Sequence, residues 1–125
     1  MDASESEWTV VLDHAFVFAE GEDPTCKKWT AILDDLVGPE DKTRIRAEQL
    51  SGTSVEIAVE DLDYDDHGDE RWSPRDHFTL AMGSTEERAI SHWPKGDGGR
   101  ITATPMSTVE DTTRVHVRAW QPKAT

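Results

Sequence analysis

The densest group of side chains that could bind a ligand lies in the segment 60–70, which holds seven carboxylates in eleven residues. Closely spaced carboxylates are the ligands that hard cations such as Ca²⁺ prefer. The first three ligand positions of an EF-hand loop are matched, by Asp61, Asp63 and Asp65. Asp66 stands where that loop needs its turn glycine and Trp72 where it needs a bidentate Glu, so the segment is not an EF-hand. A looser cation site and a solvated loop both stay open; the looser site would use Asp63, Asp65, Asp66 and Asp69.

A lone thiol and two pairs of acidic and basic neighbours are the other groups that could be reactive. Two lysines follow Cys26 and would favour its thiolate, but its place in an apolar stripe predicts a buried structural cysteine. Asp13 precedes His14 and Asp76 precedes His77, yet neighbours on a strand point to opposite faces and cannot form a dyad. We therefore predict no catalytic residue, no metal ligand and no cofactor, and expect a protein that is not an enzyme.

The charge of the chain restricts its partners. With 26 acidic and 13 basic residues among 125, the formal net charge is −13. Phosphate backbones are bound by Lys and Arg, so direct binding to nucleic acid is not expected. Three interpretations of the acidity stay open: a solvated surface, adaptation to high salt, or carboxylates that meet a basic protein surface.

The location of the protein is predicted from its termini, its apolar runs and its cysteine count. The first residues lack a basic, apolar leader, and the longest apolar run, residues 15–19, is far shorter than a membrane-spanning helix. A single cysteine forms no internal disulfide. We therefore expect a soluble protein of the cytoplasm, in a cell or an infected host, that does not contact membrane.

The first two predicted elements are a strand and a helix. Residues 8–19 alternate with period two and carry apolar groups on both faces, which predicts a strand in the centre of a sheet. Asp23 suits an N-cap, Pro24 the first helical position, and Gly38 the C-terminal end. Apolar residues recur between them at spacings of three and four, so a helix is predicted over 24–37 with Cys26 and Trp29 buried.

The next two elements are predicted to form a hairpin. Residues 43–50 and 53–62 alternate cleanly around Ser51 and Gly52. An odd loop lets apolar residues face each other, and the two possible odd registers place Arg44 opposite Glu60 or Arg46 opposite Glu56. The inward residues would be Ile45 and Ala47 on the first strand and Val55, Ile57 and Val59 on the second.

The rest of the chain reads mostly as strands. Residues 76–82 form one, residues 85–93 fit either a strand or a short helix, with the strand preferred, and residues 95–99 form a turn. A final hairpin joins 100–104 to 112–120, with Val115, Val117 and Ala119 inward on its second strand. The predicted fold class is α+β, a single domain over 1–125 in which an antiparallel meander of about six or seven strands packs on the helix 24–37. Residues 1–6 are expected to be disordered and 60–70 to form an acidic loop.

These observations leave three hypotheses for function. The first is an acidic binding protein that blocks a basic functional surface of another protein, as immunity proteins, antitoxins and phage anti-defence inhibitors do. Its contact residues would be Asp63, Asp65, Asp66, Asp69 and Glu70. The second is a small enzyme or ligand carrier whose pocket lies between helix and sheet and is lined by His14, His77, His92 or His116. The third is a virion or accessory structural component. Five tryptophans belong to core and rim packing or to a stacking platform.

Overall fold

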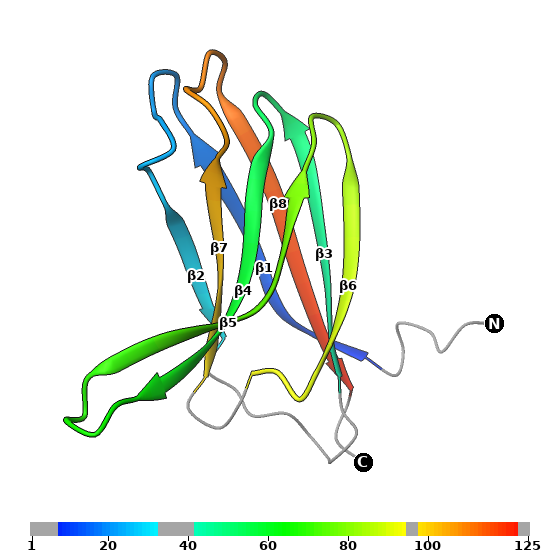
Figure 1. Ribbon diagram of the computed structural model, residues 1–125. Coiled ribbons are helices and arrows are strands. Elements are labelled where there is room, and N and C mark those ends of the chain that lie inside the picture. Colours follow the sequence, from blue (N-terminus) through cyan, green and yellow to red (C-terminus); the bar gives the residue numbers. More distant parts are fainter. Residues whose placement is uncertain (1–7, 33–41, 95–97, 123–125) are drawn as a thin grey trace.

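The computed structural model describes residues 8–32, 42–94 and 98–122, and every regular element in these ranges is a β-strand (Figure 1). The strands are β1 (Trp8–Phe18), β2 (Lys28–Ile32), β3 (Lys42–Ser51), β4 (Val55–Tyr64), β5 (Glu70–Leu80), β6 (Thr85–Ser91), β7 (Gly99–Pro105) and β8 (Thr113–Pro122). The predicted α+β class is therefore wrong, because this part of the chain is all-β. The predicted disorder of residues 1–6 lies outside the described residues.

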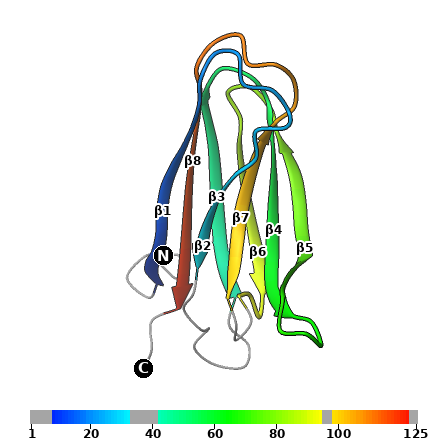
Figure 2. The same cartoon turned by 90° about the vertical axis from the view of Figure 1, so that its left-hand side faces the viewer.

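The strands form two antiparallel sheets that pack face to face as a sandwich. Sheet A has the order β1-β8-β3-β6 and sheet B the order β2-β7-β4-β5. Figure 2 shows the two layers side by side, with β1, β8 and β3 in one and β7, β4 and β5 in the other. The described ranges contain no helix, and so none that is long and apolar enough to cross a membrane.

The core lies between the sheets because every second residue of the central strands is apolar and points inward. The predicted inward residues of β3, β4 and β8 are buried, as expected: Ile45, Ala47, Val55, Ile57, Val59, Val115, Val117 and Ala119. The outward residues between them are mostly polar. Period-two alternation thus indicated both the strands and their buried faces.

Trp93 is a large core residue that lies outside the strands. It is 0% exposed, and its indole Nε1–H donates a hydrogen bond of 2.8 Å to the carbonyl oxygen of Glu60. Gly99 lies against the ring so closely that a Cβ there would sit 2.6 Å from the indole nitrogen. The glycine is therefore required by the close approach of the backbone to Trp93.

The predicted helix over 24–37 is wrong across its described part. Residues 24–25 form a turn, in which the Cys26 N–H donates to the Asp23 carbonyl, and residues 26–27 are irregular. Lys28–Ile32 is the edge strand β2, paired with β7. Cys26 is only half-buried and Trp29 is 55% exposed, so their predicted burial is also wrong. Residues 33–37 of the predicted helix lie outside the described residues.

Two predicted hairpins are wrong although their strands are correct. Strand β3 pairs with β6 and β8 in sheet A, whereas β4 pairs with β5 and β7 in sheet B, so the turn at 51–54 crosses between the sheets. Strands β7 and β8 likewise lie in different sheets. The predicted cross-strand pairs of Arg44 with Glu60 and of Arg46 with Glu56 are absent. In the described chain Glu60 pairs with Arg100 instead.

Strand β1 lies at the edge of sheet A and not in its centre as predicted. A bulge between Val10 and Leu12 shifts its register, which leaves Val10 51% exposed while Phe16 and Phe18 stay in the core. The preferred strand for residues 85–93 is confirmed by β6 (Thr85–Ser91), and the short helix is not formed.

Candidate functional site

The acidic segment forms the end of the β4–β5 hairpin, so the predicted loop over 60–70 is wrong. Strand β4 continues to Tyr64, which pairs with Glu70 of β5, and only residues 65–69 form the turn. The alternation of side chains along β4 continues into this segment. Strands β4 and β5 extend beyond the sandwich, so the segment projects from it (Figure 1). The acidic residues therefore lie on a projecting arm, which we call the acidic hairpin (residues 61–75).

The Asp65 side chain organises the turn of the acidic hairpin. Its Oδ1 accepts hydrogen bonds of 2.9 Å from the backbone N–H groups of His67 and Asp69. Two backbone hydrogen bonds, also 2.9 Å long, join Asp65 to Gly68 and Asp69, and Gly68 adopts a φ of 81°. Asp65 is thus an Asx-turn residue with a structural role, whatever else it contacts.

The structure brings the five predicted contact residues together on this arm but gives them different environments. Asp63 is half-buried on β4 and accepts a hydrogen bond of 3.1 Å from the Ser73 hydroxyl. Asp66, Asp69 and Glu70 are exposed. These three carboxylates are the ones that a partner could reach without disturbing the hairpin.

The base of the acidic hairpin is held by charged pairs that the sequence did not single out. Asp61 is 2% exposed and forms an ion pair of 3.0 Å with Arg75. On the outer face of sheet B, Arg100 pairs with Glu60 at 2.7 Å and stacks 4.2 Å from the Trp72 ring. These contacts join both strands of the arm to the sandwich. Of these residues, only Asp61 could have been recognised as buried from the sequence, because it occupies an inward position in the period-two pattern of β4.

The outer face of sheet B carries a shallow groove of about 400 Å³ above its central strands. Trp29, Thr102, Ala58 and His77 follow one another in a row across β2, β7, β4 and β5. The two central residues are small, while Trp29 is 55% exposed at the edge. Thr102 is 1% exposed and lines the groove, and within the described ranges its hydroxyl has no hydrogen-bond partner.

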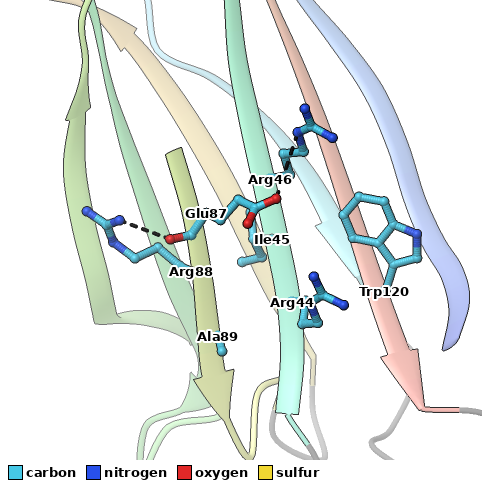
Figure 3. A pocket seen from close by; sticks show the side chains of 7 residues that line it. All are labelled: Arg44, Ile45, Arg46, Glu87, Arg88, Ala89 and Trp120. Carbon is cyan, nitrogen blue, oxygen red and sulfur yellow. Dashed lines mark hydrogen bonds and ion pairs between the residues drawn. The ribbon is translucent and has the colours of Figure 1, made fainter. Parts of the chain in front are cut away.

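The outer face of sheet A carries a second groove of about 230 Å³, lined by Arg44, Ile45, Arg46, Glu87, Arg88, Ala89 and Trp120. Figure 3 shows Arg44 and Arg46 of β3 beside Trp120 of β8, with Glu87 reaching toward Arg46 and Arg88 pointing the other way. We call this the arginine groove. It joins residues far apart in the sequence, so only the strand order of sheet A reveals it.

An acid–base pair forms across strands, between Asp13 of β1 and His116 of β8. The His116 Nε2–H donates to Asp13 Oδ1, and Arg118 lies 3.4 Å from the other carboxylate oxygen. The hydrogen bond from His116 is the main cause that lowers the pKa of Asp13 below its ordinary 3.8. The pair lies on the outer face of sheet A, where Asp13 is exposed and His116 is half-buried.

The histidines proposed for an enzyme pocket do not share one. His14 packs edge-on against Phe16, His77 lies on sheet B at 3.9 Å from Glu56, and His116 lies on sheet A. His92 sits in the turn after β6. The helix that was to close the pocket is also missing from the described part of 24–37. Within the described ranges, no three potential ligands are grouped to hold a metal ion, which leaves the looser cation site unsupported.

Comparisons with known proteins show the fold alone. No family model and no curated protein matches the chain. A structure of the Clostridium thermocellum xylanase 10B CBM22-1 and GH10 modules, complexed with xylohexaose, matches with a TM-score of 0.52 at 10% identity, over 95% of this chain and 26% of that one. The Bacillus endospore appendage pilus protein gives 0.48 at 12% identity, over 98% and 95% of the two chains. The tobacco streak virus coat protein gives 0.43 at 10% identity, over 90% and 88%.

Fold and surface together define the class of this protein as a two-sheet β-sandwich domain with a projecting acidic hairpin. The matched xylanase structure supports the sandwich. At this level of identity the comparison says nothing about what the present chain binds.

Proposed function

We propose that the protein is a non-enzymatic binding protein of the cytoplasm whose acidic hairpin docks on, and so blocks, a basic surface of a protein partner. The observation that carries the proposal is the projection of the hairpin from the sandwich, with Asp66, Asp69 and Glu70 exposed at its end. Asp63 and Asp65 add charge while they hold the arm in shape.

The electrostatics of the chain support this proposal. A formal charge of −13 steers a basic partner toward the protein, and a projecting arm meets that partner before the sandwich does. Tyr64 is 51% exposed on the same arm and supplies an aromatic side chain that is common at the centre of interfaces. The ion pair of Asp61 with Arg75 keeps the arm attached without using its outer carboxylates.

Neutralising the end of the arm tests the proposal. Asp66→Asn, Asp69→Asn and Glu70→Gln are combined in one variant, and Glu20→Gln, Glu110→Gln and Asp111→Asn in its control. Both remove three exposed carboxylates, but the control changes the loops at the opposite end of the sandwich (Figure 1).

Each protein is immobilised and exposed to a lysate of the source cells at about 50 and about 500 mM salt, where the screening length falls from roughly 14 to 4 Å. We expect a basic protein to be retained by the wild type and the control at low salt, and lost by the hairpin variant. Equal retention by the two variants, or no basic protein on any of them, would refute the proposal.

A second candidate function is favoured by the groove on sheet B. The groove is lined by Thr102 and by the charged side chains of Lys27 and Glu56, which offer donors and acceptors of hydrogen bonds. The exposed ring of Trp29, paired with Thr102 on the neighbouring strand, lies beside the groove and offers a surface for stacking. Such a lining suits a neutral, polyhydroxylated ligand. The matched xylanase structure, which holds xylohexaose, suggests the first compound to try.

Calorimetric titration with xylohexaose tests this second function. We expect heat of binding from the wild type, and none from Trp29→Ala or from Thr102→Val, which keeps the shape of the threonine and removes its hydroxyl. Trp120→Ala, on the other sheet, is the control. No heat with the wild type, or heat unchanged in both the Trp29 and the Thr102 variants, would exclude the groove as a site for this sugar.

A further inference from the structure

Three arginines line the arginine groove: Arg88 forms a close ion pair of 3.0 Å with Glu86, whereas Arg44 and Arg46 are less closely paired. Arg46 of β3 stands directly opposite Arg118 of β8, and Arg44 lies one position along the same face of β3. Like charges directly opposite each other on a sheet are destabilising. Half of the chain's eight arginines point outward on this sheet: Arg44, Arg46, Arg114 and Arg118.

The carboxylates around the groove neutralise these arginines only in part. Arg46 is 3.7 Å from Glu48 and 3.9 Å from Glu87, both longer than a contact ion pair. Arg44 packs 5.3 Å from the ring of Trp8 and, among the described residues, has no carboxylate within ion-pair distance. Although the chain has twice as many acidic as basic residues, the arginine groove on sheet A thus offers guanidinium groups to an acidic ligand.

We infer that the arginine groove receives the acidic hairpin of a second copy of this chain. The inference rests on the proposed function and names its partner. Three exposed carboxylates, of Asp66, Asp69 and Glu70, would face the guanidinium groups of Arg44 and Arg46. Tyr64 of the arm would pack on the half-buried Trp120, which lines the groove.

The hairpin cannot reach the groove of its own molecule. It extends from sheet B at one corner of the sandwich, whereas the groove lies on the outer face of sheet A, with the core between them (Figures 1 and 2). The contact therefore joins two different surfaces, one from each copy. Because each copy carries both surfaces, two copies can exchange hairpins in a closed two-fold dimer, or the contact can continue into rings or open chains of molecules.

The net charge sets the salt range in which association occurs. Two copies at −13 repel each other at long range, and at about 150 mM salt this repulsion is screened beyond roughly 8 Å. Pairs in contact are screened less. At about 1 M salt the screening length is roughly 3 Å, so we expect the affinity to fall at least tenfold.

Two variants that each lack one half of the contact provide the test. The hairpin variant, with Asp66→Asn, Asp69→Asn and Glu70→Gln, keeps the groove, and Arg44→Gln with Arg46→Gln keeps the hairpin. In the control, Lys27→Gln with Arg114→Gln, the same charge is removed from two exposed residues outside the groove. Circular dichroism and thermal unfolding show whether each variant is folded.

Sedimentation velocity at about 150 mM salt gives the result. We expect the wild type and the lysine–arginine control to form dimers or larger species, and each half-contact variant alone to stay monomeric. A mixture of the two half-contact variants should form a one-to-one dimer and nothing larger, because one intact hairpin meets one intact groove.

The outcomes separate this inference from the proposed function. A monomeric wild type, or a groove variant that still assembles, overturns self-association. If the hairpin variant nevertheless loses a different basic protein in the lysate capture, the hairpin remains a binding arm with another partner. If its neutralisation changes neither measurement, the inference and the proposed function both fail.

Discussion

At the residue scale, the core residue Trp93 and the edge residue Trp29 differ most in their expected contribution to stability. Trp93 is 0% exposed and hydrogen-bonded, whereas Trp29 is 55% exposed. We expect Trp93→Ala to lower the free energy of unfolding by about 3 to 5 kcal/mol, since it leaves a cavity and an unsatisfied carbonyl at Glu60. Trp29→Ala should cost less than about 1 kcal/mol. Urea unfolding of both variants measures the two free energies. Equal losses would contradict the burial of Trp93 or the exposure of Trp29.

The Asp13 carboxylate should give a small part of the acid sensitivity. Its pKa is lowered in the folded state, chiefly by the hydrogen bond from His116, so folding favours the ionised form. That stabilisation is present above the ordinary value of 3.8 and is lost as pH falls through the lower, folded pKa. Asp13→Asn should therefore lose less stability than the wild type below about pH 4. Thermal unfolding across this range, with Asp111→Asn as the control, would contradict the assignment if Asp13→Asn followed the wild-type curve.

At the element scale, two turns each contain a glycine with positive φ, and one of these turns is packed against a strand while the other is open to solvent. Gly52, with φ of 86°, lies so close to β8 that a Cβ would sit 2.7 Å from Thr113 Cα, whereas Gly68, with φ of 81°, faces open space. Gly68→Ala should cost about 1 to 2 kcal/mol from backbone strain alone. Gly52→Ala should cost more, because backbone atoms of β8 must move. Similar unfolding midpoints for the two would show that the crossing at 51–54 does not pack on β8.

The same scale shows what sequence patterns can and cannot predict. Clean alternation indicated β3, β4 and β8 with their buried faces, because one-sided burial makes period two visible. Strand β2 was predicted as helix because only Ile32 of its five residues is fully buried, which leaves no alternation to recognise. Pairing partners were predicted wrongly because hairpins were assumed between neighbours, whereas in this sandwich the chain crosses between sheets after β3 and after β7.

The candidate site was predictable only in the part that is local in sequence. The carboxylates of Asp63, Asp65, Asp66, Asp69 and Glu70 are close in the chain and are close in space. The arginine groove exists because β3 lies between β8 and β6. The groove at Thr102 exists because β7 lies between β2 and β4. Such non-local arrangements leave no signature in a single sequence.

At the scale of the whole molecule, charge is distributed unevenly over the sandwich. An acidic arm extends from sheet B, and arginines gather on the far side of sheet A. In this account the arm is the part of the protein that contacts a partner, while the sandwich holds it in place. The eight strands and their core supply the rigidity that such an arm needs.

Amide hydrogen exchange on the wild-type chain tests that account most directly, by comparing dilute protein with concentrated protein at about 150 mM salt. The account predicts slower exchange on association in the peptide covering residues 63–70 and in β3, where the arginine groove lies. The loops 19–27 and 106–112 at the opposite end should exchange at unchanged rates. Association that protects these loops and leaves residues 63–70 unprotected would contradict the claim that the acidic hairpin is the binding surface.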